Sequence, residues 1–402
     1  MPRQVRQKLL DQIQAERKDR LVIAYITSTR PGAETLIADD AFRLLYDHLQ
    51  RNESRAKNGV DLFLHSNGGS GTVPWRIVSL IRQYADNFAV LVPHHAFSAA
   101  TLIALGADEI VMHRMGVLGP IDPSVANIFN PPNPQSPGQL APISVEDVTA
   151  FFRLVREEAE INHEDEVIQA LLALTDKVHP LALGNVQRHQ SQSKMMARKL
   201  LKKHMKDGDA VDHDIDILIE KLKSGLFFHG HPINRDEAKD DLKLKVVKPS
   251  DELEKLMWDL YLDYETEMKF QEPFNPAREL ELAKQQELAK QTVEAPPLTT
   301  QAIVQQLIQM AKSGLSLGCG LPEAQMVNVA AAILSHLQSG GQPQDKVIVV
   351  KGRPGAYLES SGKTHVNRVD LRLERVIIQT PGGPQEGYKQ EVLWQRWEEE
   401  TA

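Results

Sequence analysis

Short apolar runs alternate with glycine turns and helix-compatible segments between residues 61 and 125, and this stretch restricts the possible folds more than any other. The runs 62–64 and 89–93 have the length and composition of buried strands. A further strand and helix are predicted at 21–26 and 37–49. Buried strands that alternate with helices indicate parallel strands joined by right-handed crossovers. We therefore expect an α/β core of stacked β-α-β units.

The pair Gly68-Gly69 and the serine Ser98 supply the parts of an acyl-transfer site. Glycine lets the backbone approach a ligand with φ values that are closed to other residues. Ser98 begins a helix-compatible segment, where the N–H of a residue such as Ala99 has no acceptor within the helix. A serine hydroxyl beside backbone donors suits a nucleophile with an oxyanion hole. The same residues also suit ordinary roles, because serine is a favoured N-cap and Gly-Gly is common in turns.

Three motifs in this stretch, SNGGSG, HHAFSAATLIALGADEIVM and VLGPIDP, resemble the serine dehydrogenase proteinase family. That family is related to signal peptide peptidase A and to the Clp protease proteolytic subunit. The similarity covers roughly residues 20–247, and the segment 228–238 (FHGHPINRDEA) resembles the family's H-x-x-P-I…E-A segment. The resemblance implies a ClpP/crotonase-like fold and a serine peptidase that forms an acyl-enzyme on Ser98. It also implies a peptide or protein substrate and assembly into a homo-oligomer.

A serine hydroxyl needs a base to become a good nucleophile. The resemblance implies serine, aspartate and histidine in that chain order, which Ser98, Asp122 and His229 match. In this scheme His229 moves the proton and Asp122 orients the imidazole. The N–H groups of Gly69 (or Gly68) and Ala99 hold the oxyanion, and no metal ion or organic cofactor is needed.

Other assignments stay open from the sequence. Residues 141–145, where related lysine enzymes carry their base, contain no lysine, and Lys194 and His231 are the alternative bases. His94 and His95 are expected to line the strand end or the substrate cleft. A crotonase-type acyl-CoA enzyme also uses paired backbone N–H groups but needs no serine nucleophile. A catalytically silent oligomeric scaffold would use the fold alone.

Composition narrows the classes of function and the compartment. A net charge of −8 and a pI near 6.0 argue against a nucleic-acid binder, which needs a basic surface. The single cysteine, Cys319, excludes an internal disulfide and a cysteine-rich metal site. The N-terminal residues lack the apolar core of a signal peptide, and no run has the length of a membrane span. We expect a cytoplasmic protein without an integral membrane segment.

Changes in sequence pattern predict three regions. The peptidase domain covers 1–250, and within it a long helix over 164–205 is broken near Pro180. A helical extension and a proline-containing linker cover 251–297. Residues 298–402 form a small, separate α+β module with an accessory role.

Overall fold

The computed structural model describes residues 3–121, 124–125, 127–133, 140–141, 143–205, 209–223, 231–282, 285, 347–380 and 383–400. The chain forms two compact units. The first comprises Met1–Pro273, Pro354–Arg368 and Arg396–Ala402, and the second comprises Phe274–Arg353 and Val369–Gln395.

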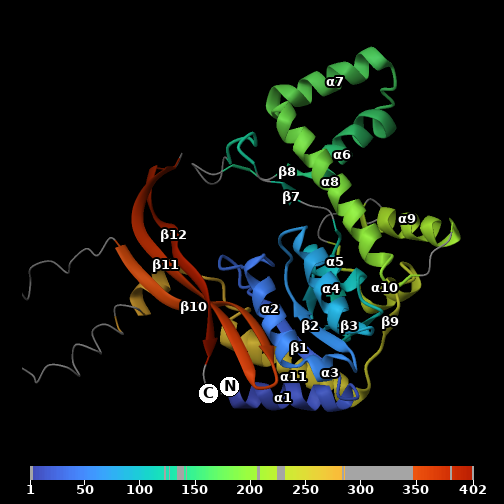
Figure 1. Ribbon diagram of the computed structural model, residues 1–402. Coiled ribbons are helices and arrows are strands. Elements are labelled where there is room, and N and C mark those ends of the chain that lie inside the picture. The colour runs from blue at the N-terminus through green and yellow to red at the C-terminus, as the bar shows by residue number, and fades with distance from the viewer. Residues whose placement is uncertain are drawn as a thin grey trace, which may run out of the picture. The chain divides into compact units, whose positions relative to one another are not determined.

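A parallel sheet forms the centre of the first unit (Figure 1). Each of its strands pairs in parallel with the next, in the order β1-β2-β3-β5-β9. The expected α/β core of β-α-β units is thereby confirmed. The strands are β1 (Leu21–Thr27), β2 (Val60–His65), β3 (Phe88–Val92), β5 (Glu109–Met112) and β9 (Val246–Val247).

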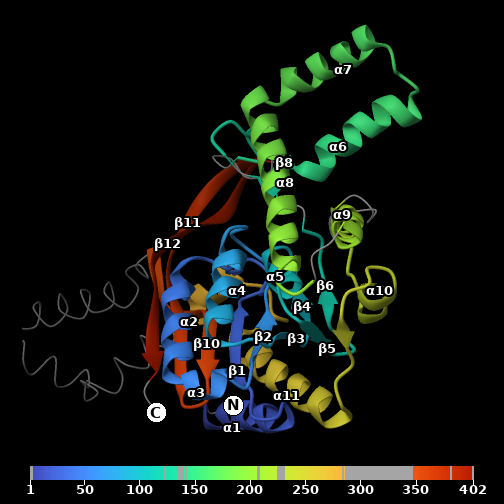
Figure 2. The ribbon, with the colours of Figure 1, turned by 45° about the vertical axis from the view of Figure 1, so that its right-hand side comes forward.

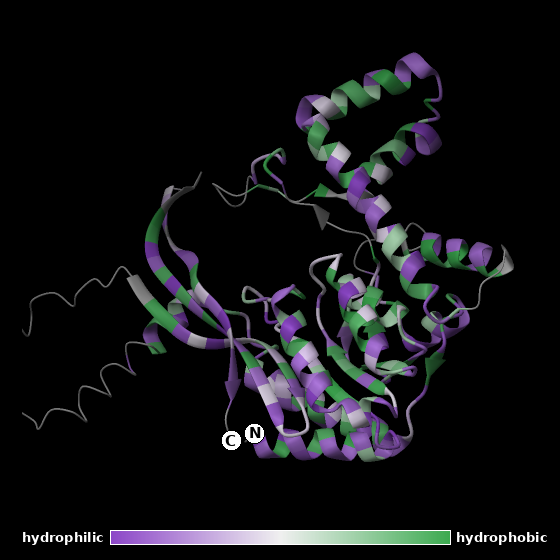
Figure 3. Ribbon diagram, viewed as in Figure 1, coloured by the Kyte–Doolittle hydropathy of each residue, from purple (hydrophilic) through white to green (hydrophobic). Residues whose placement is uncertain are grey.

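Helices cover both faces of this sheet, and alternate residues of each strand face opposite layers. On β1, Leu21, Ile23 and Tyr25 pack with the layer of α2, α4 and α5, whereas Val22, Ala24 and Ile26 pack with the layer of α1 and α11. Figures 1 and 2 show α1 and α11 side by side on one face of the sheet. Because both faces are covered, β1, β2 and β3 are hydrophobic over most of their length (Figure 3). The helices are α1 (Arg3–Glu16), α2 (Asp40–Arg51), α3 (Glu53–Ala56), α4 (Val73–Tyr84), α5 (Ala99–Leu105) and α11 (Asp251–Met268).

The segment between the core strands β5 and β9 contributes the remaining helices. The predicted long helix is present as two, and its break coincides with Pro180 at the first position of the second one. α8 contacts both α5 and α9. The elements are α6 (Val145–Arg153), a π-helix (Leu154–Glu158), α7 (Glu164–Lys177), α8 (Pro180–Leu201), α9 (Asp209–Lys223) and α10 (Arg235–Asp240).

Long strands from the C-terminal region complete the sheet order as β12-β11-β10-β1. The expected separate C-terminal unit is present, but Pro354–Arg368 and Arg396–Ala402 belong to the first unit. There β10 pairs antiparallel with β1, from Ile23↔Ser360 to Thr27↔Ala356. The edge of β1 that does not face β2 is therefore paired and not open to another chain. The boundary expected at residue 298 lies outside the described residues. The strands are β10 (Val347–Ser360), β11 (Lys363–Thr380) and β12 (Gly383–Glu400).

Candidate active site

Short strand pairings beyond the carboxyl ends of β2 and β3 assemble the candidate site. Ser66 pairs with Ala96, Ala96 with Leu118, and Leu118 with Ile233. The last pair is antiparallel and closed by two N–H···O bonds of 2.9 Å. The row therefore brings three motifs of the sequence together: the glycine turn, the segment of Ser98 and the H-x-x-P-I segment. The two short strands in this row are β4 (His95–Ala96) and β6 (Val117–Leu118), while β7 (Ser124–Val125) and β8 (Ile143–Ser144) pair elsewhere.

Ser98 has a backbone conformation that non-glycine residues rarely adopt, with φ 52° and ψ −112°. It occupies the N-cap position of α5, yet its side chain makes no capping hydrogen bond. The side chain is half-buried, and its hydroxyl has no hydrogen-bond partner within the described residues. The capping role that serine often has is therefore not what the structure shows. Backbone strain of this kind concentrates at functional sites.

Gly68 lies against the backbone on both sides of Ser98. Its φ is +105°, and a Cβ atom placed on it would lie 2.8 Å from the Phe97 oxygen and 2.8 Å from Ser98 Cβ. The Ala99 nitrogen would be 3.1 Å away. Only glycine fits this contact, so the turn approaches the start of α5 as closely as a backbone can.

Main-chain hydrogen bonds from Ile37 hold the residues on both sides of Gly69. The Ile37 N–H donates to the Gly68 oxygen at 2.8 Å, and the Ser70 N–H donates to the Ile37 oxygen at 2.9 Å. A trans peptide directs its C=O and N–H in opposite directions, and no peptide bond in the described residues is cis. The Gly69 N–H therefore points away from Ile37, towards the side on which Ser66 pairs with β4.

The Ala99 N–H is a second donor beside the serine. Ala99 is buried and is the first residue of α5, so its N–H lies before the first intrahelical acceptor. None of the described residues accepts a hydrogen bond from it. The Ala99 N–H beside Ser98 is therefore a donor of the type that can stabilise an oxyanion.

The expected proton-transfer residues are described only in part. Asp122 and His229 lie outside the described residues. His231 is described, and its Nε2 lies 2.8 Å and 3.1 Å from the two carboxylate oxygens of Glu237. Glu237 belongs to the first turn of α10, where the Asn234 side chain accepts its N–H at 3.0 Å. An imidazole beside a carboxylate is the arrangement that supports a general base.

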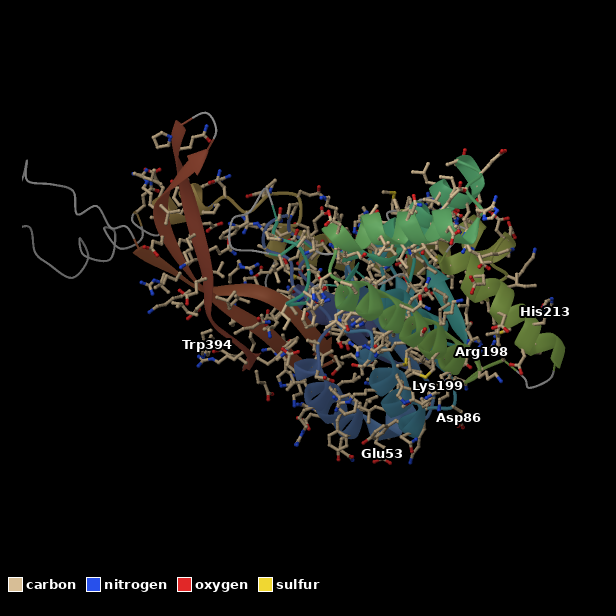
Figure 4. All side chains as sticks on the ribbon, turned by 90° about the horizontal axis from the view of Figure 1, so that it is seen from above. Glu53, Asp86, Arg198, Lys199, His213 and Trp394 are labelled. Carbon is tan, nitrogen blue, oxygen red and sulfur yellow. The ribbon has the colours of Figure 1, made fainter. Side chains whose placement is uncertain are left out.

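Lys194, the other alternative base, forms an ion pair with Glu220 of α9. The same two helices are joined through Asp212, which accepts from Arg198 at 3.4 Å and from Lys202 at 2.7 Å. Figure 4 labels Arg198 on α8 beside α9. A carboxylate partner favours the charged ammonium, whereas a general base must be neutral, so this pairing opposes a catalytic role for Lys194.

Sequence reasoning missed two buried hydroxyls beneath the glycine turn. Thr27 Oγ1 donates to Ser66 Oγ at 2.7 Å, and Ser66 Oγ accepts the Gly68 N–H at 3.0 Å. Thr27 and Ser66 are both fully buried. The motif SNGGSG contains Ser66, but the sequence gives no sign that Thr27, on another strand, contacts it.

Three histidines cluster next to the site. His65 is fully buried, and its Nδ1 accepts the His95 N–H at 3.1 Å. The rings of His94 and His95 stack with centroids 4.0 Å apart. Burial and then the neighbouring imidazoles lower the pKa of His65 well below its usual value and that of His95 to about 4. The rings of His65 and His95 are therefore neutral at pH 7. The described residues contain no group of side chains suited to hold a metal ion.

The core has the ClpP-like α/β fold, and its glycine turn lies directly against Ser98 at the start of α5. Residues 4–188 match the model of the family of ClpP-like SDH-type serine proteinases. The resemblance identified from the sequence motifs is thereby confirmed.

Similarity to individual proteins is more distant. One uncharacterized protein of Methanocaldococcus jannaschii is 26% identical over 181 residues, which are 45% of this chain and 50% of that protein. A second from the same organism is 32% identical over 113 residues, which are 28% of this chain and 39% of that protein. The chain thus spans half or less of the length of the curated relatives it matches.

Two solved structures of variants of the 1510-N membrane-bound stomatin-specific protease overlap with this chain in part. The first has a TM-score of 0.32 at 14% identity and covers 58% of this chain and 82% of its own. The second, in complex with a substrate peptide, has a TM-score of 0.31 at 15% identity. The match covers 58% of this chain and 77% of the chain in that structure. Within the described part of the present chain, no helix is both long and apolar enough to span a bilayer.

Proposed function

We propose that this protein is a serine peptidase that hydrolyses peptide bonds through an acyl-enzyme on Ser98. One observation carries the proposal: Ser98 has a strained backbone, a half-buried hydroxyl without a partner in the described residues, and Gly68 pressed against it. A structural cap would need neither the strain nor the glycine contact. The match of residues 4–188 to a family of serine proteinases supports the same chemistry.

In the proposed reaction, Ser98 Oγ attacks the carbonyl carbon of the scissile peptide while a base accepts its proton. The N–H groups of Ala99 and Gly69 (or Gly68) stabilise the oxyanion of the tetrahedral intermediate. The intermediate collapses, the C–N bond breaks, and the base returns the proton to the departing amine. Water then attacks the ester by the same path and releases the acid. This sequence requires neither a metal ion nor an organic cofactor.

For the base, we propose His229, oriented by Asp122. The ground is that Ser98, Asp122 and His229 follow one another in the chain in the same order as the family's serine, aspartate and histidine. His231 is the second candidate because it lies within hydrogen-bonding distance of Glu237. Lys194 is the third, and its ion pair with Glu220 weighs against it.

We further propose that the substrate is a peptide or protein and that the chain acts as a homo-oligomer in the cytoplasm. The single cysteine, Cys319, suits a reducing compartment, and the resemblance to oligomeric proteases supports assembly. Native mass measurement of the purified chain tests the oligomer.

Labelling with a fluorophosphonate probe tests the proposed nucleophile. The wild-type chain should gain one probe mass on the peptide that contains Ser98, and Ser98→Ala should abolish the adduct with the fold retained. Ser70→Ala, which removes an exposed serine from the same region, should label like wild type. A wild-type chain without an adduct, or a Ser98→Ala variant that still carries one, would contradict the proposal.

A further inference from the structure

We propose that Ser66 and Thr27 are positioning residues for the oxyanion hole. Their hydroxyls hold the peptide unit between Gly68 and Gly69 so that the Gly69 N–H, rather than the Gly68 N–H, faces the reacting carbonyl. The inference rests on the proposed role of Ser98 as the nucleophile.

The Ser66 hydroxyl makes hydrogen bonds to Thr27 and to both main-chain groups of Gly68. It accepts from Thr27 Oγ1 at 2.7 Å and from the Gly68 N–H at 3.0 Å, and it donates to the Gly68 oxygen at 3.3 Å. A hydroxyl has one donor and two acceptor positions, so all three are occupied. The Gly68 N–H is therefore engaged beneath the turn and is not available to an oxyanion.

The Gly68 oxygen is held from two sides. It accepts the Ile37 N–H at 2.8 Å in addition to the Ser66 hydroxyl. Because the peptide is planar and trans, the Gly69 N–H is fixed in the opposite direction. Ile37 lies on one side of the turn, and β4, which leads into Ser98, lies on the other side. Because the Gly69 N–H points away from Ile37, we infer that it points towards the side of β4 and Ser98.

Without these hydroxyls, the peptide between Gly68 and Gly69 would keep the hydrogen bond from Ile37 but would lose its support on the Gly68 N–H side. Gly68 and Gly69 have φ values of +105° and +153°, and glycine moves between backbone conformations more readily than any other residue. Oxyanion stabilisation depends on donors that are already in place when charge develops. Thr27 is the last residue of β1 and Ser66 directly follows the parallel neighbour β2, and both are fully buried, so the hydroxyl pair anchors the turn to the rigid sheet.

The two glycines of the turn then have different roles. Gly68 supplies the close approach to Ser98, and Gly69 supplies the donor. Removing the Ser66 hydroxyl should slow every step in which the oxyanion forms. It should not change the pH at which the general base titrates. The loss of one oxyanion-hole donor typically lowers a rate by about 100- to 1000-fold, and a donor that is only misplaced should cost about tenfold or more.

The test measures the second-order rate of fluorophosphonate labelling from pH 6 to 9, with urea unfolding of each full-length variant. Ser66→Ala should lower the rate about tenfold or more at every pH and leave the midpoint of the pH profile unchanged. Ser66→Thr, which keeps the hydroxyl, should restore most of the rate, and Thr27→Val should show a smaller loss. Ser360→Ala is the matched control, because Ser360 is equally buried and hydrogen-bonded to His48 but belongs to β10. It should lose stability and label like wild type.

Wild-type labelling by Ser66→Ala, or an equal loss in Ser360→Ala, would overturn the inference and leave the nucleophile intact. If Ser66→Ala does not fold, Thr27→Val decides, and a wild-type rate in that variant overturns the inference. A wild-type chain that is not labelled at Ser98 would remove the proposed function itself, and the positioning role with it.

Discussion

The backbone of Gly68 lies directly against Ser98, so close that a Cβ atom on Gly68 would lie 2.8 Å from Ser98 Cβ. The two residues are 30 positions apart in the chain, and the pairing of Ser66 with Ala96 brings them together. The contact makes the turn sensitive to a single methyl group.

Gly68→Ala should therefore abolish activity. The new Cβ would collide with the Phe97 oxygen, and φ +105° is strained for alanine, so we expect a loss of about 1–3 kcal/mol in the free energy of unfolding. Fluorophosphonate labelling at Ser98 should disappear. Gly71→Ala in the same loop is the control, because a Cβ there has no neighbour within 4 Å. Equal behaviour of the two variants would refute the close contact.

Replacing the two histidines of the H-x-x-P-I segment separately should identify the base. Because a positioned general base contributes about 100- to 10,000-fold, His229→Ala should lower the labelling rate by at least the smaller factor. His231→Ala is the matched variant and should retain most of the rate. The opposite pattern would transfer the role to His231 and its partner Glu237. A large loss in Lys194→Met alone would favour the lysine.

Acid should destabilise the first unit through its buried imidazoles. His48 is fully buried, with Nδ1 2.7 Å from Ser360 Oγ and Nε2 3.0 Å from His365 Nδ1. Burial, followed by the nearby charge of His365, Lys363 and Arg51, lowers the pKa of His48 to about 3. The unfolded chain then binds the proton more strongly than the folded one. Above pH 6.5, His48 is neutral in both the folded and the unfolded chain and does not lower the free energy of unfolding. As the pH falls from 6.5 towards 3, the unfolded chain is protonated first, and the free energy of unfolding decreases.

Urea unfolding of the wild type and of His48→Gln at pH 7.5 and 5.5 measures this effect. Glutamine keeps a polar group but does not titrate, so the variant should lose less stability between the two pH values than the wild type. Carboxylates titrate mainly below this window, which isolates the histidine contribution. An equal loss in both proteins would show that His48 does not titrate as the geometry implies.

A buried ion-pair cluster at the amino ends of the strands should contribute strongly to stability. Asp61 on β2 is fully buried and lies 2.5 Å from Arg17 Nε and 2.7 Å from Arg20 Nε. Asp61→Ala removes the buried carboxylate and leaves both arginines with the partly exposed Glu109, so we expect a cost of about 3 kcal/mol, at the lower end for breaking a buried pair. Asp39→Ala breaks the exposed pair with Arg76 and should cost less than about 1 kcal/mol. Chemical denaturation compares the two, and similar values would contradict the difference in burial.

The sequence by itself determined the elements of the core and the serine. Apolar runs such as 62–64 and 89–93 are long enough to define buried strands, and the helix break near Pro180 follows from the missing N–H of proline. These features are local, since each depends on a few adjacent side chains. The family motifs add Ser98 and the glycine pair, because the resemblance rests on those residues themselves.

Only the tertiary structure decided which distant residues complete the site and the sheet. Thr27 contacts Ser66 because β1 and β2 are neighbours, and Lys194 meets Glu220 because α8 packs on α9. The pairing of β10 with β1 joins positions more than 300 residues apart through main-chain hydrogen bonds. Main-chain groups are the same in every residue, so no side-chain pattern specifies such a partner. Close approach of separate elements, rather than local preference, sets these contacts.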